Sequence, residues 1–165
     1  MLREIDEQLQ GANPDVVVAP VGVGSFAQAV VTHAKGPGRK TRVLTVEPET
    51  AACLNESLKQ GQAWSIKTAP TIMTGMDCGT VSSIAWPMLK AGADASVTVS
   101  DYQAHTATEY LRACGVDAGP CGGATVAAVR GLTQKQNESL GICEQSTIVL
   151  LCTEGARSYS ISSAE

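Results

Sequence analysis

The sequence predicts an α/β protein of three layers, in which a mostly parallel sheet carries helices on both faces. Short β-branched runs alternate with stretches of helical composition along the 165 residues. Aromatic residues make up only 4% of the chain and apolar residues 44%, so Val, Ile, Leu and Ala must build the core. Such a core suits helices packed on a parallel sheet better than a β-sandwich. The length fits one domain over residues 1–165, with a helix and linker over residues 1–13.

The first half of the chain predicts a strand, a glycine loop, a helix, a second strand and a second helix. Leu2, Ile5 and Leu9 recur at helical spacing, and residues 11–14 (Gly-Ala-Asn-Pro) end that first helix. A β-branched run follows directly, and the next apolar run comes after the loop at residues 36–38. The expected elements are a strand over residues 15–19, a helix over 26–35, a strand over 42–46 and a helix over 48–60.

The second half repeats this alternation. We expect Asp101 to cap a helix, and a glycine-rich turn at residues 119–123 to open another. Strands alternating with helices favour parallel pairing with right-handed crossovers, and ligands then bind beyond the carboxyl ends of the strands. The expected elements are a helix over residues 81–91, a strand over 95–99, helices over 101–114 and 119–132 and a strand over 147–151. The turns at the carboxyl ends of the strands, where a ligand is expected to bind, are 20–26, 47–50, 100–102 and 152–155; they are called the ligand turns.

Charge and cysteine spacing exclude several classes of function. The net charge is −4 and the pI about 5.2, so we expect no nucleic-acid partner. The sequence has no apolar run long enough to span a bilayer, and its first ten residues are charged rather than signal-like, so we expect no membrane partner and a cytoplasmic location. The six cysteines form no CxxC pair, which favours free thiols and no metal site.

The loop Gly22-Val23-Gly24-Ser25 is the strongest candidate for a binding site. It follows a strand and opens a helix, where backbone amides and the helix dipole favour an anion. A sharp strand-to-helix turn would also need these glycines, and the loop alone leaves both interpretations open. Ala27 stands where a third glycine of a dinucleotide fingerprint would fall, and the sequence has no Gly-Lys-Ser/Thr motif. A nucleotide-binding domain is therefore disfavoured.

Several motifs in order resemble the fold type II (tryptophan synthase β-like) family of pyridoxal-phosphate enzymes. Residues 20–26 resemble the loop that holds the cofactor phosphate there, and Val46-Glu47-Pro48 is a typical turn after the next strand. The segment 71–79, with Trp86 after it, looks like that of the diaminopropionate ammonia-lyases of this family, which is the most specific match. Segments 119–125 and 151–155 follow in the same order, so the resemblance runs from about Pro14 to Tyr159.

The resemblance implies roles for matching residues. The amides of Gly22, Val23, Gly24 and Ser25 would hold the phosphate of pyridoxal phosphate. Cys152 would lie beside the pyridine nitrogen, with Thr153 as the second candidate, although Cys152 could instead pack as a small buried residue. The residues expected near the substrate are Glu47, Asp77 and Cys78, and for the last two a role in loop packing is equally favoured.

The resemblance also implies the reaction and a departure from it. The family's catalytic lysine and substrate-carboxylate loop precede the glycine loop, and neither motif occurs in this sequence, whose six lysines all follow it as expected surface charges. We therefore expect the upstream part to be absent and this chain, by itself, to be inactive. The complete enzyme would release ammonia from a small amino acid such as 2,3-diaminopropionate by β-elimination, giving a 2-oxo acid. The alternative is a non-catalytic module that binds a phosphate ligand or a partner. A homo-oligomer is expected, because a part cut from a larger enzyme exposes apolar surface.

Overall fold

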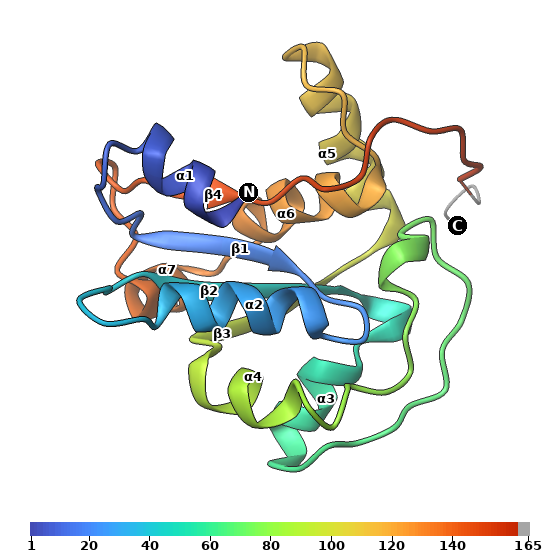
Figure 1. Cartoon of the computed structure of the whole chain (residues 1–165). Helices are drawn as coiled ribbons and strands as arrows, with labels where there is room; N and C mark the ends of the chain where they lie inside the picture. Colours follow the sequence, from blue (N-terminus) through green and yellow to red (C-terminus); the bar gives the residue numbers. More distant parts are fainter. Residues whose placement is uncertain (162–165) are drawn as a thin grey trace.

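The computed structural model describes residues 1–161 and contains a four-stranded sheet. The strands are β1 (Val16–Pro20), β2 (Arg42–Pro48), β3 (Ala95–Val99) and β4 (Ile148–Leu150), in the order β3-β2-β1-β4. Every pairing is parallel, and Val18 of β1 aligns with Leu44 of β2 and Leu150 of β4. The carboxyl ends of all four strands therefore meet at one edge of the sheet (Figure 1).

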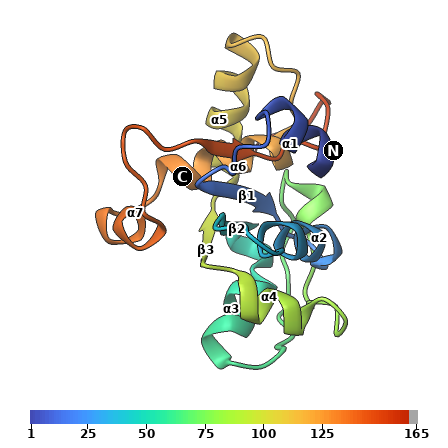
Figure 2. The same ribbon diagram turned by 60° about the vertical axis from the view of Figure 1, so that its left-hand side comes forward.

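Helices cover both faces of the sheet, which confirms the predicted three-layer α/β architecture (Figures 1 and 2). Side chains alternate along the strands, so Val16 and Val18 face one cluster while Val17 and Ala19 face the other. The first face is packed by α5 (Asp101–Ala113), α6 (Pro120–Arg130) and α7 (Gln134–Leu140), and the second by α1 (Leu2–Gln8), α2 (Ser25–Ala34), α3 (Cys53–Gln60) and α4 (Trp86–Gly92).

Strand β1 is the centre of the core because all five of its residues are buried. Val, Leu and Ala dominate both clusters, as the low aromatic content predicts. Helix α6 is buried over most of its length, and its small residues let it approach α5 closely: a Cβ on Gly123 would overlap Thr108 Oγ1. The glycine-rich turn predicted from the sequence is thus the first part of a buried helix.

Two of the expected helices are shorter than the sequence indicates. The helix expected over 48–60 is split into a 3₁₀ turn, η1 (Glu49–Ala51), and α3, because Ala52 leaves helical geometry with φ −91° and ψ 54°. The helix expected over 81–91 begins only at Trp86. Pro87 is favourable in the first helical turn because its missing amide donor has no intrahelical partner there.

The capping prediction for α5 is wrong by one residue. Ser100 is the cap, and its hydroxyl accepts from the Gln103 amide while the Gln103 side chain accepts from the Ser100 amide. Asp101 reaches away instead and accepts from Thr71 Oγ1 (2.5 Å) and the Ile72 amide (3.0 Å). Helix α7 was not predicted, although Thr133 and Gln136 form the same kind of capping box and are visible in the sequence.

The remaining features bear on the site only indirectly. The six cysteines, all within the described residues, form no disulfide. In the part of the chain that the structure describes, no helix has the length and apolar character needed to cross a bilayer. A second 3₁₀ turn, η2 (Thr74–Met76), lies in the long segment between α3 and α4.

Candidate functional site

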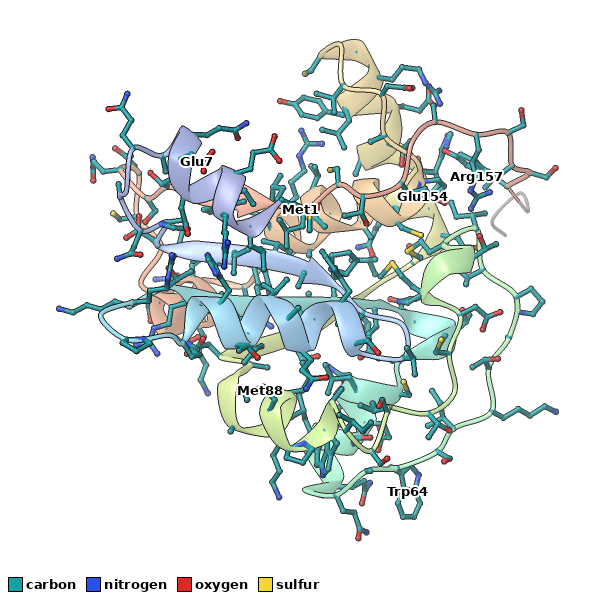
Figure 3. The ribbon with its side chains drawn as sticks, in the orientation of Figure 1. Met1, Glu7, Trp64, Met88, Glu154 and Arg157 are labelled. Atoms are coloured by element: carbon teal, nitrogen blue, oxygen red, sulfur yellow. The ribbon has the colours of Figure 1, made fainter. Side chains whose placement is uncertain are left out.

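A cleft of about 360 Å³ lies at the carboxyl edge of the sheet. The right-hand part of Figure 3, where Glu154 and Arg157 are labelled, shows this edge. Four segments far apart in the sequence meet here, and two of them follow the parallel strands β1 and β4. The lining residues are Pro20, Gly22, Val23, Gly24, Ser25, Phe26, Gly75, Met76, Cys121, Thr153 and Glu154.

The glycine loop turns its carbonyl groups into the protein. The Gly22 carbonyl lies 3.8 Å from the Cys53 thiol, and the Val23 carbonyl accepts from the Ser82 amide at 2.8 Å. The Gly24 carbonyl accepts from the Gln28 amide at 2.8 Å, which is the first bond of α2. Every carbonyl of the loop from residue 22 to 24 is therefore engaged with the protein.

The amides of the same loop are left for a ligand. Within residues 1–161, the amides of Gly22, Gly24 and Ser25 donate to no protein acceptor. The Val23 amide faces the Cys78 sulfur. Free amides at the first turn of a ten-residue helix, reinforced by its dipole, favour an anion, so the loop is a candidate anion site.

Two glycines of the loop are required by the local geometry. Gly24 adopts φ +100°, which L-residues rarely adopt, and a Cβ there would stand 2.9 Å from Leu89 Cδ1. A Cβ on Gly22 would stand 2.8 Å from the Gly75 carbonyl oxygen. A side chain at either position would force the loop away from its neighbours and change the direction of its amides.

A larger groove of about 810 Å³ runs along α1 and α2, and its chemistry is less favourable for function. Two of its polar groups, His33 and Arg39, are already paired with Asp6. The cleft at the glycine loop is smaller but contains the unpaired amides. We therefore place the candidate site in the cleft.

Glu47 lies behind the glycine loop and not on the cleft wall. It is fully buried, and its two carboxylate oxygens accept from the amides of Leu54 and Asn55, each at 2.7 Å. Burial raises the pKa of Glu47 to about 7, against the two amides, which lower it. Burial and the neighbouring Glu47 raise the pKa of Cys53 to about 12, so that thiol is a neutral contact for Gly22. Glu47 thus fixes the start of α3, and a place beside the substrate remains a prediction.

Cys152 and Thr153 follow β4 at the predicted edge, but they face different neighbours. Thr153 lines the cleft with the glycine loop. The Cys152 thiol packs on α6, 3.6 Å from the Gly122 carbonyl oxygen and 4.0 Å from Thr125 Oγ1, and desolvation raises its pKa. Thr153 therefore lies on the cleft wall. Cys152 is exposed although its thiol contacts α6, so it is not a buried packing residue, and its place beside the pyridine nitrogen stays a prediction.

The lyase-like segment reaches the cleft through residues other than those selected from the sequence. Gly75 and Met76 line it, whereas Asp77 is exposed beside it and Cys78 packs against Gly22. The segment is held from two sides, by the Asp101 carboxylate, which accepts from the Ile72 amide, and by the Arg157 guanidinium, which donates to the Ile72 carbonyl and to Thr74 Oγ1.

The sequence analysis placed Glu154 within the ligand turn 152–155 without selecting it as a site residue, and it missed Arg157. Glu154 Oε2 accepts from the Cys121 amide at 2.7 Å, and its Oε1 accepts from Arg157 Nε at 2.7 Å. Against desolvation, which raises it, Arg157 and the Cys121 amide hold the pKa of Glu154 below its ordinary value. The spacing of three residues between an acidic and a basic side chain just after the last strand was the available signal.

No lysine is among the described residues that line the cleft. Lys35 is paired with Asp94, Lys59 with Glu56, and Lys90 donates to the Gly61 carbonyl. The chemistry of the cleft therefore consists of backbone amides, the hydroxyls of Ser25 and Thr153, one neutral thiol and one carboxylate. Such a set binds and orients an anionic molecule but includes no amine nucleophile.

Comparisons with known proteins agree with this geometry. The model of the family described as "Pyridoxal-phosphate dependent enzyme" matches residues 1–154. Diaminopropionate ammonia-lyase of Salmonella typhimurium is 31% identical over 106 residues, which are 59% of this chain and 26% of that protein. The biosynthetic L-threonine dehydratase of Mycobacterium leprae is 30% identical over 155 residues, 92% of this chain and 34% of its own length.

The solved structures give the same result for the fold. The threonine deaminase of the organism abbreviated "T.th." superposes with a TM-score of 0.81 at 26% identity, over 96% of this chain and 55% of that one. This chain thus spans about a quarter to a third of the length of the curated relatives and about half of this solved neighbour.

The residues present fit the phosphate group of pyridoxal phosphate. Three unpaired amides converge at a helix N-terminus, and the two glycines that shape the loop have no room for a side chain. The Thr153 hydroxyl lies on the same wall for the polar part of a bound molecule. With the family model matching nearly the whole chain, the fold, the loop and the comparisons lead to one conclusion: the chain belongs to the family of pyridoxal-phosphate dependent enzymes.

Proposed function

We propose that this chain supplies the cofactor-phosphate site of a β-eliminating ammonia-lyase that acts on a small amino acid such as 2,3-diaminopropionate. The products would be a 2-oxo acid and ammonia. The set of unpaired amides at Gly22, Gly24 and Ser25 is the single observation that carries the proposal. The 31% identity to a diaminopropionate ammonia-lyase supports the reaction class, and the similarity to a threonine dehydratase supports elimination from a small amino acid.

The residues of this chain would bind and orient rather than form a covalent bond. The three amides would hold the phosphate, with the dipole of α2 adding to the attraction. Thr153 would offer its hydroxyl to the ring, with Cys152 as the other candidate, and a neutral group there would keep the ring nitrogen largely unprotonated. When bound, pyridoxal phosphate supplies a ring that stabilises negative charge at the α-carbon of the amino acid.

The amine that takes the α-proton would come from outside the residues that line this cleft. None of them is a lysine, and the lysines at 35, 59 and 90 are held elsewhere. We propose that catalysis needs a lysine from a preceding segment or from another chain. The same observation favours a second candidate function, a non-catalytic module that binds a phosphate ligand.

A binding experiment tests the proposed site. The chain should bind pyridoxal phosphate more tightly than pyridoxal, which lacks the phosphate, and inorganic phosphate should compete. Borohydride treatment followed by peptide mass mapping should find no cofactor attached to an internal lysine. Equal affinities for the two compounds, or a single lysine labelled in high yield, would contradict the proposal.

Activity separates the two candidate functions. If the chain is part of an ammonia-lyase, adding the preceding segment of a related enzyme as a separate polypeptide should restore release of ammonia from 2,3-diaminopropionate. The module hypothesis predicts phosphate binding with no activity in that mixture. A Gly24→Val version of the chain serves as the matched negative control.

We also propose that the chain associates with itself. Ile84 is 78% exposed, and Trp64 and Met88 are also exposed apolar side chains. Strands β3 and β4 are the outermost strands of the sheet, with one neighbour each. Light scattering should find a dimer or larger assembly. A strict monomer at high concentration that binds no apolar dye would show that these surfaces are tolerated in a single domain.

A further inference from the structure

The wall of the cleft carries a charged side chain at one position. Of the described residues that line it, Glu154 alone has an ionisable group that is charged at neutral pH. The other acidic group on the wall, the Cys121 thiol, is neutral because burial and the neighbouring carboxylate raise its pKa to about 12. The electrostatics of the cleft therefore depend on the glycine-loop amides and on Glu154.

The surroundings of Glu154 keep its carboxylate ionised and directed toward the cleft. The countercharge, Arg157, does not line the cleft and lies farther out (Figure 3). Arg157 is held there by the Ile72 carbonyl and Thr74 Oγ1. A Cβ on Gly119 would stand 2.6 Å from the Glu154 carboxyl carbon, so the carboxylate occupies space that only glycine leaves free.

The carboxylate has capacity for a further donor. Each of its oxygens accepts one hydrogen bond from the protein, while an ionised carboxylate offers about four lone-pair positions. The cleft thus combines amide donors that attract an anion with an acceptor that attracts a cation. A cationic donor would form a charge-assisted bond, roughly twice as strong as a neutral one.

We propose that Glu154 is a specificity-determining residue, which selects amino acids with an ammonium group on the side chain over those with a hydroxyl. This rests on the proposed function, because it takes the cleft as the place where the amino acid binds beside the phosphate. Such a preference would separate the substrates named for the two curated relatives, since diaminopropionate carries a second amine and threonine a hydroxyl. Arg157 is the positioning residue that orients the carboxylate.

The test compares two ligands of similar size on the full chain saturated with inorganic phosphate. Affinities for L-2,3-diaminopropionate and L-serine are measured by NMR titration at a pH where both amines are protonated. The wild-type chain should prefer the diamine by about tenfold, and Glu154→Gln should bring the ratio close to one while the chain still binds phosphate. Glu154→Asp, which keeps the charge, should retain part of the preference.

The exposed pair Glu109 and Arg112 on α5 gives a matched control, with the same spacing of three residues away from the cleft. Glu109→Gln should leave the ratio unchanged. If phosphate affinity is intact, the role of Glu154 would be overturned by an unchanged ratio of affinities in folded Glu154→Gln or by no preference for the diamine in the wild-type chain. Loss of phosphate affinity in the wild-type chain would instead overturn the proposed function, so the two failures are distinguishable.

Discussion

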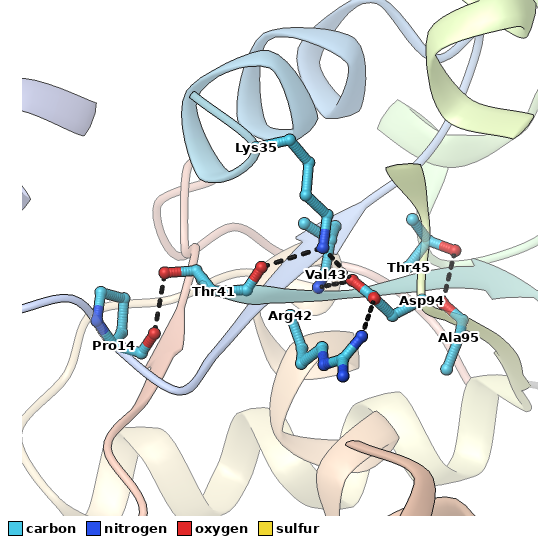
Figure 4. A network of polar contacts seen from close by, with 8 residues as sticks. All are labelled: Pro14, Lys35, Thr41, Arg42, Val43, Thr45, Asp94 and Ala95. Atoms are coloured by element: carbon cyan, nitrogen blue, oxygen red, sulfur yellow. Dashed lines mark hydrogen bonds and ion pairs between the residues drawn. The ribbon is translucent and has the colours of Figure 1, made fainter. Parts of the chain in front are cut away.

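The two edges of the same parallel sheet are built differently. At the amino edge, Asp94 pairs with Lys35 at 2.5 Å and with Arg42 at 2.8 Å, and it accepts from the Val43 amide at 2.7 Å (Figure 4). At the carboxyl edge, the amides of the glycine loop have no protein partner within the described residues. The polar groups of Asp94 at the amino edge join elements of the fold, whereas three amides of the glycine loop at the carboxyl edge have no protein partner among the described residues.

The carboxyl groups of the two edges also differ in their pKa shifts. Against desolvation, Lys35 and Arg42 help to hold the pKa of Asp94 below its ordinary value, and Arg39 is the largest cause that lowers the pKa of Asp6. At the carboxyl edge, burial raises the pKa of Glu47 to about 7. Glu154 is the exception there, because Arg157 accompanies it. The charged form of Glu47 is therefore disfavoured by burial, whereas those of Asp94 and Glu154 are favoured by their cationic partners.

The largest expected effect is that of replacing Gly24 by valine at the carboxyl edge. The same replacement of a glycine near the amino edge is the control. Gly24→Val should lower affinity for phosphate and pyridoxal phosphate at least about a hundredfold, because the side chain would meet Leu89 and redirect the amides. Gly38, near the amino edge, also has a positive φ, +76°, but nothing lies within 4 Å of its Cβ position.

Gly38→Val should therefore cost only the backbone strain, about 1–2 kcal/mol, with phosphate affinity unchanged. Calorimetric titration and thermal unfolding of both variants measure the two effects separately. Equal affinities in the two variants would remove the functional distinction between the edges.

The pH dependence of stability should carry the signature of Glu47. Its folded pKa of about 7 lies above the ordinary 4.5, so the folded state binds the proton more tightly between these values. The stabilising contribution of Glu47 is then fully present below about pH 4.5 and is lost as the pH rises through about 7. This loss lowers the free energy of unfolding by about 3 kcal/mol at most. Cys53 stays neutral in this range, and Lys59 partly offsets the effect.

Denaturant titrations from about pH 4.5 to about pH 8 measure this loss. Glu47→Gln should flatten the dependence, whereas Glu49→Gln, at an exposed neighbour, should keep it. A wild-type stability that rises across the whole range would show that the two amides outweigh burial.

Asp94→Asn should lower the free energy of unfolding by about 2 kcal/mol, because two cations and one amide lose their charged partner. The pH dependence of this contribution is opposite in sign to that of Glu47. Because the pKa of Asp94 is lowered in the folded state, its contribution is lost as the pH falls through the folded pKa. Chemical unfolding at neutral pH gives the difference, and phosphate affinity should stay the same. Weaker phosphate binding in this variant would show that the two edges are coupled.

The smallest effect is expected at Asp6, which joins α1 to Arg39 and His33. Asp6→Asn should lower the melting temperature less than Asp94→Asn does, because partly exposed ion pairs contribute little. Raised salt should reduce the difference further. Glu7→Gln, one residue along the same helix, is the control, and an effect at Asp6 larger than that at Asp94 would contradict this ranking.

The sequence by itself determined the class of fold and predicted where the candidate site lies. β-branched runs alternating with helical stretches fix a parallel sheet, because burial on both faces and crossover helices leave few other arrangements. Gly22 and Gly24 marked a strand-to-helix turn that is the candidate anion site, since only glycine tolerates such close approach. These features are local, and local chemistry is readable along the chain.

The tertiary structure decided which side chains share the cleft. Gly75 and Met76 line it rather than Asp77 and Cys78, and Glu47 turns inward to the start of α3. The places of Glu154 and Arg157 depend on contacts with residues 33 and 85 positions away, namely Cys121 and Ile72. Such pairings follow from how helices pack on the sheet and leave no periodic signal in the sequence, because side-chain direction in an irregular loop is set by its neighbours in space.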